Sequence, residues 1–309
     1  MKKHIPLALC AIVMLLLAAS CEKEGVYSPG KRISKIYVDN DSWKKLEQEW
    51  TWKGDLLQSV SYYGGMYELR FHYDGKQLVS ITQLGGNNKY YLFHYNKNGK
   101  KLDSLDVYVD KLDHSPNVLH YAHYDFSYND AGLISGYDEV TYYTGWYKED
   151  EQVFALVLQC AVPGLPDVAA RQLTKTDIRN KGDEFVWDRY SVSFVYNDEN
   201  VTECLVTMND RYKYSYTFTY TDYQNPSYKL FQSAGFESSS LYSRNLVKTC
   251  HYEEHLLEEP TADYYVDMEY LYEIADQYPV KVTRNQCIRY FAFPEYSDSS
   301  TNMHYYEYG

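Results

Sequence analysis

One short segment of this chain has the residue types and spacing of a zinc-dependent hydrolytic site. His251 and His255 are four residues apart, and Glu254 lies between them. On a helix these histidines would share a face, so both could bind zinc while the glutamate acts as a general base. No residue downstream is marked as a third ligand. A polar surface loop or short helix is the simpler explanation, so we predict no metal site and keep these three residues only as candidate ligands.

A second group of histidines lies earlier in the chain. His114, His120 and His123 are close in sequence, with Asp113 and Asp125 beside them. His120 and His123 should point to opposite faces of a regular strand, which indicates separate, hydrogen-bonded side chains. There is no nucleophile elbow, P-loop or dinucleotide fingerprint, and 43 acidic residues single out no carboxylate pair. We predict neither catalytic residues nor a cofactor.

Tyrosine is the remaining chemical lead, because the chain contains 37 of these residues. Tyr and Trp rings suit stacking on sugars and also protein interfaces. Adjacent aromatic pairs should place one ring on the outer face of a strand, so the weak candidates for ligand binding are Tyr142, Tyr143, Trp146 and Tyr147. The alternative is that aromatic side chains line both sides of a curved sheet.

A repeated pattern indicates which elements position these side chains. An aromatic residue, any residue and a tyrosine precede Asn or Asp, a Gly follows within a few positions, and Leu or Ile comes next. The residues before each turn alternate with period two, as in Tyr214 to Thr221, which predicts half-buried antiparallel strands. Asp74-Gly75 is the kind of pair that closes a tight hairpin. The clear copies begin at Phe71, Phe93 and Phe126, and weaker copies at Phe194, Phe218 and Tyr270.

The apolar residues after each turn are three apart instead of two, as in Leu78 and Ile81. Perfect alternation would put them on opposite faces, so we expect a bulge or a strongly twisted start in the returning strand. We predict an all-β fold of seven or eight hairpins in an antiparallel meander. The hairpins should form one large curved or partly closed barrel-like sheet with low helix content. Longer spacings predict insertions near 106–120, 144–180 and 233–262 within a single domain at 35–309.

The N-terminus has the features of a processing signal. Lys2 and Lys3 precede an apolar run that is too short to cross a bilayer comfortably. The sequence Ala-Ala-Ser-Cys at 18–21 resembles a bacterial lipobox, whose cysteine takes a diacylglyceryl group and becomes the new N-terminus. Residues 1–20 are then a lipoprotein signal peptide, Cys21 carries fatty acyl chains such as palmitate, and 21–34 form a tether. An ordinary cleaved signal with an incidental cysteine is the alternative.

The net charge bears on the choice of partner, and the cysteines bear on whether disulfides form. Removing residues 1–20 takes away two lysines and no acids, so the net charge changes from −13 to −15. A field of this sign repels phosphate, and no basic stripe interrupts it, so nucleic acid is an unfavourable partner. Outside the cytoplasm, both disulfides and buried free thiols are open to the remaining cysteines. These are Cys160, Cys204, Cys250 and Cys287.

The Tyr-x-Tyr-(Asn/Asp)-x-x-Gly-x-Leu-x-Ser units resemble the YD repeats of Rhs-type surface proteins. With the lipobox and the charged Glu22-Lys23-Glu24, they look more like Bacteroidetes outer-envelope lipoproteins of unknown function with a porin-like β fold. The segment 270–282 resembles the closing repeat of that family. The resemblance covers roughly 35–309. It implies a fold and an outer-membrane location, with surface exposure as an option, and it carries no catalytic residues.

Two hypotheses from different classes follow. The first is a membrane-anchored, non-enzymatic envelope lipoprotein that binds or presents a glycan or a partner envelope protein. The second is an extracytoplasmic hydrolase, directed at glycans or peptides, that uses acids or the pair His251 and His255. An integral outer-membrane barrel is a third interpretation. It needs strands of about 9–11 residues and two aromatic girdles, whereas most clean alternations here span seven or eight residues.

Overall fold

The computed structural model describes residues 26–39, 43–85, 88–110, 118–143, 186–209, 212–230, 243–256, 264–290 and 297–309. This part of the chain is almost entirely β-strand, and none of it is helical. It therefore contains no helix that could cross a membrane. The strands are β1 Ile33–Asp39, β2 Lys44–Lys53, β3 Leu56–Tyr62, β4 Tyr67–Asp74, β5 Gln77–Leu84, β6 Lys89–Tyr95, β7 Leu102–Asp110, β8 Val118–Tyr128, β9 Ile134–Tyr143, β10 Val186–Asn197, β11 Asn200–Met208, β12 Tyr212–Gln224, β13 Asn245–Leu256, β14 Tyr264–Ala275, β15 Tyr278–Tyr290 and β16 Asp298–Tyr308.

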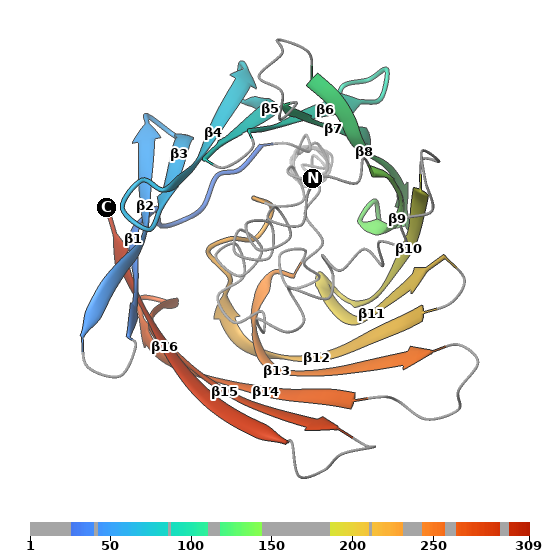
Figure 1. Cartoon of the computed structure of the whole chain (residues 1–309). Helices are drawn as coiled ribbons and strands as arrows, with labels where there is room; N and C mark the ends of the chain where they lie inside the picture. The colour runs from blue at the N-terminus through green and yellow to red at the C-terminus, as the bar shows by residue number, and fades with distance from the viewer. Residues whose placement is uncertain are drawn as a thin grey trace, which may run out of the picture.

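The sixteen strands form a closed antiparallel barrel in which every strand pairs with its neighbours in sequence (Figure 1). The barrel closes where β1 pairs with β16, from Ile33 opposite Tyr308 to Asp39 opposite Met303. The all-β meander is confirmed, but the expected partly closed sheet was wrong, because this last ladder leaves no free edge. Strand β7 continues to Asp110, β8 begins at Val118, and β13 occupies 245–256, so parts of the segments expected as insertions are strand.

Seven hairpins and the closing pair of β16 with β1 share the predicted aromatic pair and the predicted bulge. In one hairpin His72 pairs with Ser80 and Tyr73 with Leu78, so the ladder skips a residue. Leu78 and Ile81, three apart, therefore both point inwards, with 1% and 0% of their surface exposed. Equivalent inward pairs follow the other register shifts and form two rings around the barrel: Ile33/Ile36, Leu57/Val60, Leu102/Leu105, Ile134/Tyr137, Val201/Cys204, Val247/Cys250 and Pro279/Val282.

The second aromatic residue of each pair ties its hairpin to the preceding one. Tyr73 donates its hydroxyl to the carbonyl of Leu57 at 2.9 Å, and Trp52 donates its indole N–H to Ile33 at 2.8 Å. Each acceptor lies beside a bulge, where the regular ladder is interrupted. A ring of hydrogen bonds therefore closes the short-turn end of the barrel; its other members are Tyr95 to Leu78, Tyr128 to Leu102, Tyr196 to Ile134, Tyr220 to Val201, Tyr272 to Val247 and Tyr308 to Pro279.

Mostly apolar and aromatic side chains line the inside of the barrel, with a smaller set of buried polar ones such as Glu47, Arg284 and His304, and polar side chains predominate on its outside. One buried cluster takes residues from all sixteen strands, and only the inside of a closed barrel is reached by all of them. Tyr27 belongs to this cluster, and its hydroxyl donates to the carbonyl of Pro226 at 2.6 Å. Figure 1 shows the coil before β1, which contains Tyr27, running inside the ring of strands. Alternate residues of the same strands, such as Arg70 and His72, point outwards and are exposed.

Candidate functional site

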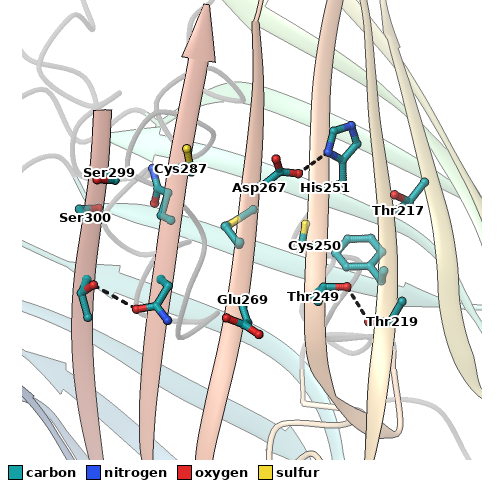
Figure 2. Close-up of a pocket in the computed structure, with 15 residues that line it drawn as sticks. Thr217, Thr219, Thr249, Cys250, His251, Asp267, Glu269, Cys287, Ser299 and Ser300 are labelled. Atoms are coloured by element: carbon teal, nitrogen blue, oxygen red, sulfur yellow. Dashed lines mark hydrogen bonds and ion pairs between the residues drawn. The ribbon is translucent and has the colours of Figure 1, made fainter. Parts of the chain in front are cut away.

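The wall formed by β12 to β16 carries a hollow of about 580 Å³. Three consecutive residues from each of these five strands touch it, and Figure 2 shows the strands side by side. The middle residues of four strands, for example Phe218 and Cys250, belong to the buried inner face. The flanking residues are paired in register across the wall and form two outward-facing rows, Thr217–His251–Asp267–Cys287–Ser299 and Thr219–Thr249–Glu269–Asn285–Thr301.

Hydrogen bonds within these rows hold the polar side chains in place. The hydroxyl of Thr301 donates to the side-chain oxygen of Asn285 at 3.0 Å, and the hydroxyls of Thr219 and Thr249 are bonded to each other (Figure 2). The surface therefore presents hydroxyl, amide and carboxylate groups at the spacing of neighbouring strands, about 4.8 Å apart. Such groups exchange hydrogen bonds with the hydroxyls of a polar ligand.

His251 and His255 lie on β13, so the helix that a zinc hydrolase motif requires does not form. Glu254 points to the opposite face, where the hydroxyl of Tyr252 donates to it at 3.4 Å. The two histidines instead share Glu253, at 3.0 Å from Nε2 of His251 and 3.1 Å from Nε2 of His255. The expected loop or short helix is therefore wrong. Side chains alternate between the two faces of a strand, which places residues 251, 253 and 255 together on the outer face.

We call His251, Glu253, His255 and Asp267 the Glu253 cluster. Hydrogen bonds link these four side chains one after another. Nδ1 of His251 lies 2.6 Å from Oδ1 of Asp267. Burial acts to lower the pKa of His251, but hydrogen bonds to Asp267 and Glu253 raise it. The hydrogen bond from His251 lowers the pKa of Glu253. The histidine nitrogens and carboxylate oxygens thus alternate along β13 and β14, and the metal-donor atoms do not converge on one point.

A second cluster lies on the outer face of β6, β7 and β8, where three histidines surround one carboxylate. Nε2 of His120 and Nδ1 of His123 lie 2.9 and 2.7 Å from Oδ1 of Asp106. Nε2 of His94 lies 2.9 Å from Oδ2 of the same residue. We call Asp106, His94, His120 and His123 the Asp106 cluster.

A bulge in β8 brings His120 and His123 together. Val107 pairs with Ala122 and Tyr108 with His120, so the ladder skips Tyr121. The expectation that the two histidines point to opposite faces assumed a regular strand and was wrong for this reason. The three-residue spacing that predicted bulges after the turns is also present here and was the available signal. The spacing of His120 and His123 did not predict this bulge, because the residues around them lack the Asn/Asp and Gly of the turn repeat. His114 lies outside the described residues.

The Asp106 cluster has a distinct charge distribution. Burial acts to raise the pKa of the Asp106 carboxyl, but hydrogen bonds from His123 and His120 outweigh it and hold that pKa below its usual range. Burial acts to lower the pKa of His123, but hydrogen bonds to Asp106 and Asp125 raise it. Nε2 of His123 lies 3.1 Å from Oδ1 of Asp125. His123 is therefore held between two carboxylates.

Tyr142, a candidate for ligand binding, packs its ring on this cluster. Its centroid lies 4.6 Å from that of His120, and Tyr108 stacks at 4.9 Å from His120. The side chain of Tyr143, and Trp146 and Tyr147, lie outside the described residues, so these candidates stay predictions.

The cysteines of the described strands are free thiols. Cys204 and Cys250 are buried on the inner face, and Cys287 is half-buried in the outward row of β15. Cys204 and Cys250 lie on strands separated by β12, about 10 Å apart at the usual strand spacing, which is too far for a disulfide. Cys160 lies outside the described residues.

Comparisons with known proteins gave structural neighbours only. No family model and no curated protein matches this chain. A porin-like protein from Bacteroides vulgatus ATCC 8482 is 12% identical, with a TM-score of 0.47, and covers 90% of this chain and 99% of its own. A porin-like protein from Bacteroides uniformis ATCC 8492 is 11% identical, with a TM-score of 0.43 and coverages of 90% and 98%. At this level of similarity we draw no functional argument from either protein.

Proposed function

We propose that the protein is a non-enzymatic lipoprotein of the cell envelope, held at the outer membrane by lipid on Cys21. In this proposal the barrel stands in water and serves as a binding or scaffold module. The observation that carries the proposal is the polarity of the barrel wall, whose inner face is mostly apolar and aromatic and whose outer face is mostly charged and hydroxyl-bearing.

A barrel that sits in a bilayer needs the opposite polarity. Its outer surface carries an apolar band about 25 Å tall with aromatic girdles, and its interior is polar. Here the outward positions of β4 include Glu68, Arg70 and His72. The most exposed large apolar side chains of the described residues lie on different turns and strands: Trp43, Met66, Leu92, Val195, Tyr223 and Leu271. Membrane attachment then falls to the lipid, and a diacyl group supplies the two chains that stable anchoring requires.

The wall of β12 to β16 is the surface that we assign to ligand binding. Its two outward rows present hydroxyls, the Asn285 amide and the carboxylates of Asp267 and Glu269 over five strands. A glycan offers hydroxyls that match this set, and a partner envelope protein offers backbone and side-chain polar groups. The hydrolase hypothesis loses its zinc motif, because β13 holds His251 and His255 on a strand and turns Glu254 away from them; a hydrolase that uses acids stays a prediction.

Membrane attachment is tested by Cys21→Ser in the native host. We expect the wild-type protein in the membrane fraction, extracted by detergent and not by carbonate. The variant should appear in the aqueous fraction, folded and without detergent. A Cys21→Ser variant that stays in the membrane until detergent is added would show that the barrel itself is embedded.

Binding is tested by screening the Cys21→Ser protein against host and dietary polysaccharides. We expect a glycan that binds the wild-type wall and is weakened by Asp267→Asn with Glu269→Gln. The matched control is Glu68→Gln on β4, which should change nothing. Capture of a stoichiometric envelope protein with no glycan bound would replace the glycan by a protein ligand. Turnover of a glycan or peptide that a chelator abolishes would overturn the non-enzymatic proposal.

A further inference from the structure

We propose that Asp106, His120 and His123 form a binding site for a divalent transition-metal ion of the zinc type on the outer face of β7 and β8. One donor atom from each residue lies within 4.8 Å of the other two. The Asp106 carboxylate is the common point, since both imidazole nitrogens already lie within hydrogen-bond distance of its Oδ1. In the part of the chain that the structure describes, no other group of at least three such donors converges in this way.

The donor set selects the kind of ion. Two imidazole nitrogens with one carboxylate oxygen suit Zn²⁺, Co²⁺, Ni²⁺ or Cu²⁺, whereas Ca²⁺ and Mg²⁺ take oxygen ligands. Zinc binds these atoms at about 2.0–2.2 Å in a tetrahedron, so small side-chain movements from the present hydrogen-bonded arrangement are enough. Nε2 of His94, which lies 2.9 Å from Oδ2 of Asp106, is within reach of the fourth position, and water is the alternative ligand there.

The groups around the donors are arranged as in metal sites. A metal-binding histidine usually gives its other ring N–H to a carboxylate, which fixes the tautomer and the ring orientation. His123 has this arrangement, because Nδ1 faces Asp106 while Nε2 lies 3.1 Å from Oδ1 of Asp125. The ring of His120 is held by its contacts with Tyr108 and Tyr142. These contacts orient both imidazoles before an ion arrives.

The site is open enough for an ion to enter from water. The side chains of Asp106, His120 and His123 are 18%, 35% and 29% exposed. The Glu253 cluster provides an internal comparison, because it also has two outward histidines with carboxylate partners. Its donors form a chain along β13 and β14, so an ion that contacts both histidines there would have to rearrange the cluster.

The test is a titration of the mature protein, purified in detergent and stripped of metal, with Zn²⁺ by calorimetry and with Co²⁺ by visible absorption. We expect one ion per chain and Co²⁺ d–d bands that Zn²⁺ displaces. Loss of an outer partner alone costs about 10–100-fold in affinity, so His120→Asn with His123→Asn should cost at least about 100-fold. Asp125→Asn leaves every ligand in place and should weaken binding about tenfold. The matched control, His251→Asn with His255→Asn, should bind as tightly as the wild type.

Equal affinity of the wild type and the His120/His123 double variant would overturn the proposal. Absence of saturable binding below about 100 µM ion, or loss of binding in the His251/His255 control, would do the same. These substitutions are on the outer face, and equal urea midpoints without metal establish that the variants are folded. If the double variant does not fold, Asp125→Asn and the Co²⁺ spectrum of the wild type decide the matter.

Discussion

A buried pair on the inner face, Glu47 and His304, should give the protein an unusual pH response. Oε2 of Glu47 lies 3.6 Å from Nε2 of His304. Burial raises the pKa of Glu47 from 4.5 to about 7, although Tyr63 and Arg284 act to lower it. Burial, followed by the charge of Arg284, lowers the pKa of His304 from 6.5 to about 4. Between these values both groups are neutral when folded, so the contact is not an ion pair there.

The two groups link stability to pH with opposite signs. Glu47 binds its proton more tightly when folded, so its contribution is complete below about pH 4.5 and is lost as the pH rises through 7. His304 binds its proton less tightly when folded, so its contribution is complete above about pH 6.5 and is lost as the pH falls through 4. Each slope is about 1.4 kcal/mol per pH unit. In the wild type the two slopes cancel between about pH 4.5 and 6.5.

Removing one partner should uncover the slope of the other. In Glu47→Gln, the free energy of unfolding relative to wild type should fall by about 1.4 kcal/mol per unit as the pH decreases through this window. This relative free energy should fall by a similar amount in His304→Gln as the pH increases. Urea unfolding followed by tryptophan fluorescence at several pH values measures both differences. His72→Gln on the outer face is the control and should follow the wild type. Two difference curves that are flat, or that slope in the same direction, would refute the assignment of neutral, oppositely shifted groups.

Three further predictions concern the barrel wall. Tyr128→Phe removes one donor from the ring of hydrogen bonds and should cost about 1–2 kcal/mol in urea unfolding, because a carbonyl beside a bulge loses its partner; no loss would mean that water replaces the hydroxyl. Leu78→Ala empties part of an inner ring and should cost about 2–5 kcal/mol, whereas Leu92→Ala on the outer face should cost less than about 0.5 kcal/mol; equal costs would contradict the assignment of the faces. Iodoacetamide should alkylate Cys287 in the native protein and leave Cys250 unmodified, because Cys250 is buried and burial raises its thiol pKa. Mass spectrometry measures both sites, and modification of Cys250 first would contradict this order.

The candidate site shows where prediction from sequence reached its limit. The sequence singled out His251, Glu254 and His255 through a helical motif, and a polar loop or short helix was expected there, because histidines four apart share a face on a helix and on a strand alike. Joint metal binding by His120 and His123 was not expected, because two histidines three apart face opposite ways on a regular strand. The bulge at Tyr121 reverses that conclusion, and His94 and Asp106 come from two other strands. Which side chains meet across strands depends on register, which no local pattern here specified.

By itself, the sequence determined the hairpin repeat. Alternation before the turn, a residue such as Gly75 with a φ of 62°, and apolar residues three apart are local features, and local sterics and burial decide them. Only the tertiary structure decided that the sixteen strands close into a barrel and that the mostly apolar face lies inside. Closure depends on the tilt and register summed over sixteen strands, and the final ladder joins Ile33 to Tyr308 across almost the whole chain. The Asp106 cluster also depends on pairing between strands, because the register of β6, β7 and β8 and the bulge at Tyr121 bring three histidines to one carboxylate.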